Sequence, residues 1–216
     1  METVFHDGRT TAYRATGFGS GPRVCHVHGA GGTHGVWVEQ YGDRDGPPAV
    51  AVDLSGHGDS DDIDADPGTE TVEAYADDVI AVCETTGASV LCGHSMGGAV
   101  ALWVAAERDL DLSALVLADS GAKLGVDDGL LSTGPAVTLR DFRTCNDFDV
   151  RDRTGEVTVP TLALCGEYDR MTPPQFHEYL AAELPDCEYE EIPGAAHMSM
   201  LERPERFNEA VRSFLL

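Results

Sequence analysis

Short apolar runs alternate with segments of helical period along most of this chain. An opening pair, 3–6 and 10–14, predicts a β-hairpin that turns at Asp7-Gly8. Several of the later runs lack polar alternation, which is typical of strands covered on both faces. These later runs lie near residues 24–27, 49–54, 89–92, 112–118, 160–165 and 188–192.

Helical patterns lie between these runs. One helix is predicted from an apolar face with residues at spacings of three and four, and Gly87 should end it. This face consists of Val72, Tyr75, Ala76, Val79 and Cys83. Further helices are expected over 97–107, which is rich in alanine, and over 173–183 and 204–216, which begin with prolines. The alternation predicts an α/β fold with a mostly parallel central sheet and helices on both faces.

Residues 120–158 break this rhythm, because they are rich in Gly, Asp and Thr and show no long, clean period. Structureless loops of this length are uncommon in compact domains and are usually functional. We therefore expect a single domain over 1–216 with a short cap insertion at about 120–158.

Composition narrows the class of protein. The chain has 216 residues, of which 42% are hydrophobic, and its apolar stretches are far shorter than the roughly 20 residues that cross a bilayer. The first residues lack the basic and apolar regions of a secretory signal, so we expect a cytoplasmic protein. The six cysteines form no Cys-x-x-Cys pair, which favours free thiols over a zinc site or a redox dithiol.

Charge is the strongest anomaly of the composition. The chain has 14 Lys+Arg against 38 Asp+Glu, a formal net charge of -24, which makes nucleic acids and anionic membranes poor partners. The acidic residues are spread along the chain, as in proteins of salt-loving microbes, where molar salt screens self-repulsion. An ordinary acidic surface is the alternative.

The motif with the clearest chemistry is the pentapeptide 93–97, Gly-His-Ser-Met-Gly, between the apolar run at 89–92 and the helix predicted at 97–107. A G-x-S-x-G turn between strand and helix holds its serine at the carboxyl edge of the sheet, beside a helix N-terminus that favours developing negative charge. Ser95 is therefore the candidate nucleophile. Asp169 and His197 each follow a later predicted strand, in the order Ser, Asp, His expected for this arrangement.

With these residues in place, the chain resembles the α/β-hydrolase superfamily of serine hydrolases over nearly its whole length. Five segments carry the resemblance: 28–32 (HGAGG), 53–60 (DLSGHGDS), 93–98 (GHSMGG), 166–173 (GEYDRMTP) and 194–197 (GAAH). The resemblance implies that Asp169 orients His197, which removes the proton from Ser95. Asp119, after the run at 112–118, is a rival for the acid, because some members of the superfamily use that position.

An oxyanion hole is expected from backbone N–H groups. The amide of Met96, the residue after the nucleophile, supplies one donor. The resemblance points to Ala30 for the second donor, with Gly29 and Gly31 as alternatives. His28 and His94 are interpreted as packed histidines bonded to backbone.

Two patterns imitate cofactor sites. The stretch 29–35 follows a strand like a dinucleotide fingerprint, but His34 stands where the third glycine belongs. The pair His26 and His28 lacks further residues at metal-ligand spacing. We therefore expect no cofactor and no metal.

The sequence thus predicts a serine hydrolase of the carboxylesterase class that acts on a small-molecule ester through an acyl-enzyme. We expect it to be a monomer or a homodimer. The predicted substrate-binding residues are Trp37, Leu124, Phe142 and Met198. Because the same triad occurs in other chemistries, two alternatives stay open. One is a ligand sensor with little turnover, and the other is a C–C hydrolase or acyltransferase.

Overall fold

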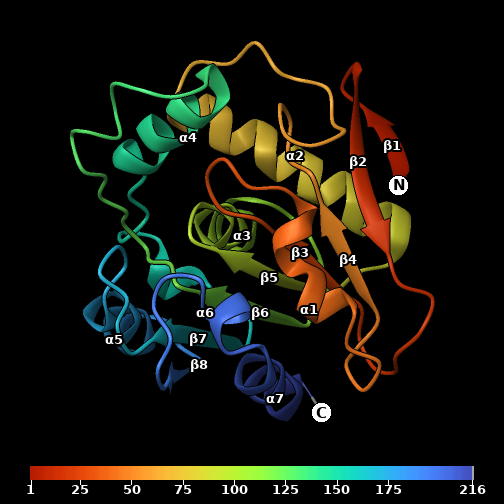
Figure 1. Cartoon of the computed structure of the whole chain (residues 1–216), viewed down its shortest axis with the longest axis vertical. Coiled ribbons are helices and arrows are strands. Elements are labelled where there is room, and N and C mark those ends of the chain that lie inside the picture. The colour runs from red at the N-terminus through yellow and green to blue at the C-terminus, as the bar shows by residue number, and fades with distance from the viewer. Residues whose placement is uncertain (216) are drawn as a thin grey trace.

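Within residues 1–215, which the computed structural model describes, eight strands form one sheet in the order β1-β2-β4-β3-β5-β6-β7-β8 (Figure 1). β1 and β2 are antiparallel to each other, and β2 is antiparallel to β4. The six strands β3 to β8 run parallel to one another. The strands are β1 (Glu2–His6), β2 (Arg9–Ala15), β3 (Val24–Val27), β4 (Ala49–Val52), β5 (Val90–His94), β6 (Ala114–Ala118), β7 (Thr161–Gly166) and β8 (Cys187–Ile192).

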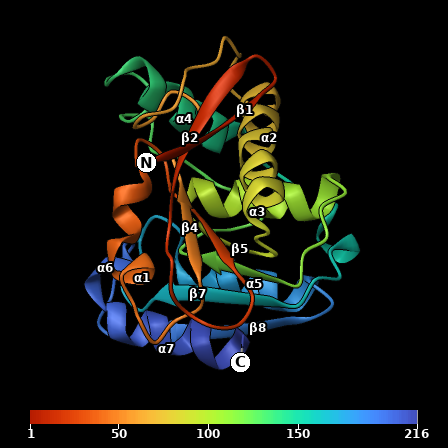
Figure 2. The same ribbon diagram turned by 90° about the vertical axis from the view of Figure 1, so that its right-hand side faces the viewer.

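Helices cover both faces of the sheet, as the sequence predicts. Figure 2 shows α3 and α7 on opposite sides of β7. None of the helices in the described part of the chain is long and apolar enough to span a membrane. The helices are η1 (His34–Trp37), α1 (Val38–Tyr41), α2 (Thr69–Thr86), α3 (Met96–Glu107), α4 (Ala136–Asp147), η2 (Thr154–Glu156), α5 (Pro174–Glu183), α6 (Ser199–Glu202) and α7 (Pro204–Leu215).

Two cores form because side chains alternate between the faces of each buried strand. In β3, Cys25 and Val27 join the core that α2 and α3 cover, while Val24 joins the core that contains Phe207 of α7. All four residues of β3 are buried. Strands covered on both faces need apolar residues at successive positions, which explains the uninterrupted runs in the sequence.

The predicted elements are present, with small shifts at their ends. The hairpin turns at Asp7 and Gly8, which both adopt positive φ (44° and 79°), as an Asp-Gly turn of this kind requires. Gly87 ends α2 in the left-handed conformation. β4 stops at Val52, before the predicted end at 54, and β6 begins at Ala114, later than the predicted 112. Residue 216, the predicted end of the last helix, lies outside the described residues.

The segment between β6 and β7 contains a helix that the sequence analysis missed. Here α4 packs against α2 and α3, and Figure 1 shows it beside α2. Lys123 and Asp149 form an isolated antiparallel bridge at the two sides of this segment. The segment is therefore folded, with a helix and a bridge, rather than a structureless loop.

Candidate active site

Ser95 occupies a strained turn at the carboxyl end of β5. Its φ of 51° and ψ of -118° lie in a region that residues with a side chain rarely adopt. The flanking glycines permit this turn, because a Cβ on Gly93 would meet the backbone of Gly97, and a Cβ on Gly97 would meet the carbonyls of Val27 and His28. The packing therefore demands small residues at both positions.

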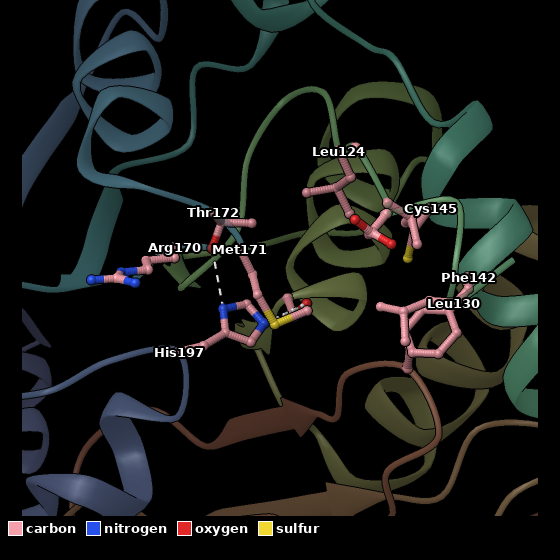
Figure 3. Close-up of a pocket in the computed structure, with 13 residues that line it drawn as sticks. Leu124, Leu130, Phe142, Cys145, Arg170, Met171, Thr172 and His197 are labelled. Atoms are coloured by element: carbon pink, nitrogen blue, oxygen red, sulfur yellow. Dashed lines mark hydrogen bonds between the residues drawn. The ribbon is translucent and has the colours of Figure 1, made fainter. Parts of the chain in front are cut away.

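The structure brings the three predicted catalytic side chains together. His197 Nε2 lies 3.1 Å from Ser95 Oγ, and His197 Nδ1 lies 2.9 Å from Asp169 Oδ2. Figure 3 shows the imidazole beside Thr172 and Met171, with its nitrogens directed to either side. The residues come from three separate loops at the carboxyl edge of the sheet, after β5, β7 and β8. This geometry suits transfer of a proton from the serine to the histidine.

Asp169 is held as an ionised hydrogen-bond acceptor. Its Oδ1 accepts the amides of Met171 (2.8 Å) and Thr172 (3.1 Å), and its Oδ2 accepts the hydroxyl of Thr172 (2.7 Å). Burial favours the protonated carboxyl, but hydrogen bonds from His197 and Thr172 outweigh burial and lower the pKa of Asp169. The sequence analysis assigned no role to Thr172, although its place three residues after the acid was a local signal.

Asp119, the rival acid, serves a different partner. Its Oδ1 accepts the amide of Gly166 (2.8 Å), and its Oδ2 accepts the amide (3.0 Å) and hydroxyl (2.6 Å) of Ser199. Burial is the main reason that the pKa of Asp119 is raised to about 7. Among the described residues, the Nδ1 of His197 contacts the carboxylate of Asp169 rather than that of Asp119.

The backbone around His197 is fixed by two side chains. His94 is buried and its Nε2 lies 2.6 Å from the carbonyl oxygen of His197, while burial lowers the pKa of His94 to about 3. A neutral ring therefore donates to that carbonyl. Glu202 accepts the amides of Ala196 (2.8 Å) and Met198 (3.1 Å) on either side of the histidine. The sequence offered no local signal for Glu202, because its role depends on the fold of the loop.

Two backbone amides, those of Met96 and Ala30, are the predicted donors of an oxyanion hole. Met96 is the first residue of α3, so its N–H lies at the open N-terminus of the helix. Ala30 lines the same cavity as Ser95 and His197. The alternative donor Gly31 already donates to Asp141 Oδ2 at 2.8 Å, which leaves Ala30 and Gly29 as the candidates for the second donor. His28, interpreted as a packed histidine, bonds to the backbone of Gly29 and Leu54.

A small cavity of about 180 Å³ opens at Ser95 and His197. Leu124 and Phe142, two of the predicted substrate-binding residues, line it, and Figure 3 shows both across the cavity from the imidazole. A second hollow of about 150 Å³ adjoins the same serine, and Met198 lies on its wall. The larger cavity is lined by Ala30, Ser95, Leu124, Gly125, Val126, Asp127, Leu130, Phe142, Cys145, Arg170, Met171, Thr172 and His197.

Trp37 lies elsewhere, so its predicted place in the substrate pocket is wrong. Its side chain is fully buried in the core, with its ring 4.7 Å from that of His26 and 6.1 Å from that of Phe207. The short helix η1 turns the indole beneath the sheet instead of toward the serine. A large aromatic residue in a loop near the site was insufficient to predict its direction.

Three donor atoms in the described part of the chain lie close enough to share a cation. They belong to Asp119, Cys165 and Asp169, and lie within 4.8 Å of one another. The carboxylates already accept the hydrogen bonds described above, and burial raises the pKa of the Cys165 thiol. A cation could bind only by displacing the N–H and O–H groups that already donate to these carboxylates. The cluster therefore fits a hydrogen-bonded support of the site better than a metal centre.

Comparisons with known proteins agree with this architecture. Residues 26–156 match the alpha/beta hydrolase family. The 3-oxoadipate enol-lactonase 1 of Acinetobacter baylyi is 23% identical, over 96% of this chain and 94% of that protein. A pimeloyl-[acyl-carrier protein] methyl ester esterase of Neisseria meningitidis is 28% identical, over 78% of this chain and 68% of its own length.

Solved structures extend the likeness to the whole fold. A thermophilic esterase superposes with a TM-score of 0.82 at 30% identity, covering 99% of this chain and 96% of its own. The enol-lactonase from Burkholderia xenovorans LB400 has a TM-score of 0.80 at 22% identity, covering 99% of both chains, and shows the fold alone. From the family match over more than half its length, the chain belongs to the alpha/beta hydrolase family.

Proposed function

We propose that this protein is a serine hydrolase that cleaves small carboxylic esters through an acyl-enzyme. The observation that carries the proposal is the chain of contacts from Ser95 Oγ to His197 (3.1 Å) and from His197 to Asp169 (2.9 Å), with Ser95 and His197 lining a cavity. Relatives named as esterases and enol-lactonases support ester chemistry.

In the proposed reaction, His197 takes the proton of Ser95 while the serine oxygen attacks the ester carbonyl. The amides of Met96 and Ala30 stabilise the negative charge on the carbonyl oxygen. His197 then gives its proton to the departing alcohol, which leaves the acyl group on Ser95. Water, deprotonated by the same histidine, releases the acid and restores the serine.

The size and lining of the cavity favour a short acyl group. Its volume of about 180 Å³ is below the roughly 300–1,000 Å³ of pockets that take drug-sized ligands. Leu124, Leu130 and Phe142 supply apolar surface. A compact acyl chain on one side of Ser95 and a small alcohol in the adjoining hollow fit this shape, and a cyclic ester joins the two in one molecule.

The test is steady-state hydrolysis of p-nitrophenyl acetate, butyrate and octanoate, together with a simple lactone, in the presence of EDTA. We expect continuous turnover, highest with the shorter chains, and loss of at least about a thousandfold in Ser95→Ala and His197→Ala. Ser132→Ala, at an exposed serine, is the matched control and should retain full activity.

Other outcomes would favour the alternatives. One slow turnover with retained product would favour a ligand sensor, and cleavage of a β-diketone without ester hydrolysis would favour a C–C hydrolase. Loss of activity with EDTA, restored by one metal, would contradict a reaction without cofactor.

We further propose that the acidic surface adapts the protein to high salt. A net charge of -24 weakens the folded state through self-repulsion, which screening relieves. If charge screening is the cause, the melting temperature should rise with KCl and level off well below about 1 M. If exclusion of salt from apolar surface is the cause, the melting temperature should keep rising with salt concentration and rise more with sulfate than with chloride. A flat melting temperature up to 2 M KCl would contradict the proposal.

A further inference from the structure

Helix α4 carries a fully buried carboxylate, Asp141, that joins three distant segments. Asp141 Oδ2 accepts the amide of Gly31 (2.8 Å) and lies 2.8 Å from His57 Nε2. Asp141 Oδ1 accepts the hydroxyl of Tyr75 at 2.7 Å. The side chain is 0% exposed, so each of these bonds forms away from water, where the loss of a partner is costly.

The first of these contacts reaches the loop after β3, residues 28–33, which contains Ala30 and is called the oxyanion loop below. Gly31 directly follows Ala30, so the bond from Gly31 N–H to Asp141 holds the peptide unit next to the one that carries the Ala30 N–H. Gly31 adopts a φ of +64°, and a Cβ on it would lie 3.1 Å from Thr138 Oγ1, another residue of α4. Two residues of α4, Thr138 and Asp141, thus lie against Gly31 of this loop.

The other contacts hold Asp141 itself in place. Burial opposes ionisation of the His57 ring, but the hydrogen bond to Asp141, the charge of Asp141 and backbone hydrogen bonds together outweigh burial and raise the pKa of His57. Tyr75 also accepts from Arg140 at 3.3 Å, and Arg140 is paired with Asp62 at 2.8 Å. The carboxylate is therefore braced from α2, from the loop after β4 and from α4, and it has little freedom to release the amide of Gly31.

We propose that Asp141 is a positioning residue that holds the oxyanion loop, so that the Ala30 N–H meets the charge that develops on the substrate. The inference rests on the proposed function above. It also assigns two tasks to α4, because Phe142 and Cys145 of the same helix line the cavity. The segment between β6 and β7 then determines the alignment of the reacting group as well as the shape of the pocket.

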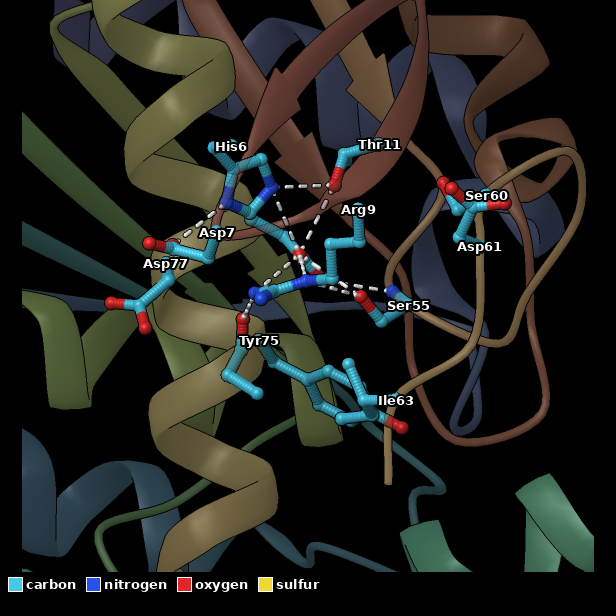
Figure 4. A network of polar contacts seen from close by, with 12 residues as sticks. His6, Asp7, Arg9, Thr11, Ser55, Ser60, Asp61, Ile63, Tyr75 and Asp77 are labelled. Carbon is cyan, nitrogen blue, oxygen red and sulfur yellow. Dashed lines mark hydrogen bonds and ion pairs between the residues drawn. The ribbon is translucent and has the colours of Figure 1, made fainter. Parts of the chain in front are cut away.

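A second buried carboxylate offers a matched control. Asp78 of α2 is also 0% exposed, and it accepts from Arg9 (3.0 Å), Thr11 (3.1 Å) and the amide of Ser55 (2.8 Å). Figure 4 shows these partners converging beside α2, from the hairpin and from the loop after β4. Asp78 forms none of its described bonds with the oxyanion loop, so its loss weakens the fold without releasing Gly31.

The test compares Asp141→Ala, Asp141→Asn, Asp78→Asn and Tyr75→Phe. Hydrolysis of p-nitrophenyl acetate gives kcat and KM, and hydrogen exchange measures opening of the backbone in a peptide covering 28–33. We expect kcat to fall about a hundredfold in Asp141→Ala and about tenfold in Asp141→Asn, with KM within threefold, because a misplaced donor acts on the transition state. Exchange in the peptide should rise in the same order.

Asp78→Asn should lower the melting temperature while kcat and the exchange of this peptide stay within twofold of wild type. Tyr75→Phe removes one of the hydrogen bonds that hold Asp141 in place, so it should lower kcat and raise exchange by less than Asp141→Asn does. An Asp141→Ala variant that behaves like Asp78→Asn in both measurements would overturn the proposal. If Asp141→Ala does not fold, Asp141→Asn decides by the same criterion. Absence of hydrolysis in the wild type would contradict the proposed function, and the exchange measurement would still decide whether Asp141 holds the loop.

Discussion

Two buried aspartates follow neighbouring strands at the carboxyl edge of the sheet, yet their surroundings differ. Asp169, after β7, accepts from Thr172 and lies 2.9 Å from His197. Asp119, after β6, accepts only backbone and serine donors in the described contacts, from Gly166 and Ser199. The pKa of Asp169 is lowered, whereas burial raises the pKa of Asp119 to about 7.

The difference shows that place in the fold does not by itself define a catalytic acid. Both carboxylates follow strands that pair with each other. The loop after β8 brings His197 to Asp169 and brings Ser199, two residues later, to Asp119. Asp169 therefore contacts the candidate base, while Asp119 contacts Ser199 at the start of α6.

The largest expected contrast is between Asp169→Asn and Asp119→Asn. Loss of the charge that orients His197 should lower kcat by about 10³–10⁴-fold, because the imidazole loses the partner that selects its tautomer. Asp119→Asn should stay within about tenfold of wild type. Steady-state kinetics with p-nitrophenyl acetate measure both, and a reversed order would make Asp119 the acid.

A smaller effect is expected from Thr172→Val, which removes the hydroxyl 2.7 Å from Asp169 Oδ2. The carboxylate keeps its two backbone donors but gains freedom to turn, so kcat should fall about tenfold with little change in KM. Thr161→Val is the control, because the hydroxyl of this buried threonine of β7 bonds, among residues 1–215, to the carbonyl of Val159 alone. Equal kinetics in the two variants would remove Thr172 from the account.

The two acids should also affect stability in different pH windows. The raised pKa of Asp119 contributes stability that is complete below pH 3.8 and is lost as the pH rises through about 7. The lowered pKa of Asp169 contributes stability above pH 3.8 that is lost only at more acidic pH. The melting temperature of wild type relative to Asp119→Asn should therefore fall between pH 4 and 8.

Thermal melts across that range provide the measurement, with Asp169→Asn as the comparison. Relative to that variant, the melting temperature of wild type should show no such decline above pH 5. A constant difference between wild type and Asp119→Asn would mean that Asp119 does not titrate in this window.

The smallest effect is expected from Ser199→Ala. The change removes the hydroxyl 2.6 Å from Asp119 Oδ2 and should lower the free energy of unfolding by about 1–2 kcal/mol. Activity should remain within twofold, since the triad is untouched. Urea unfolding and kinetics measure the two quantities, and a tenfold loss of kcat would indicate that Asp119 acts on catalysis.

Much of this arrangement could be predicted from the sequence because it depends on local patterns. The buried strands need continuous apolar runs, and the turn at Ser95 needs small residues at Gly93 and Gly97. These requirements leave visible signatures in short segments. The order of Ser95, Asp169 and His197 then placed the candidate triad.

The remainder depends on contacts between distant segments. The side chain of Trp37 points into the core, where it packs against Phe207, 170 residues further along the chain. No pattern in the residues around Trp37 predicts this direction. Helix α4 was missed because its apolar residues are few and one of its buried residues is the acid Asp141. A carboxylate within a helix usually indicates a solvated face, and its three partners become apparent only in the folded structure.

The central claim is that Ser95 carries the acyl group, and it is tested most directly by trapping that intermediate. Protein mixed with p-nitrophenyl trimethylacetate, which deacylates slowly, is quenched in acid and analysed by intact-mass and peptide mass spectrometry. We predict one trimethylacetyl group per chain, on the peptide that contains Ser95, and none in Ser95→Ala. Hydrolysis without an adduct, or an adduct on another residue that persists in Ser95→Ala, would contradict the account.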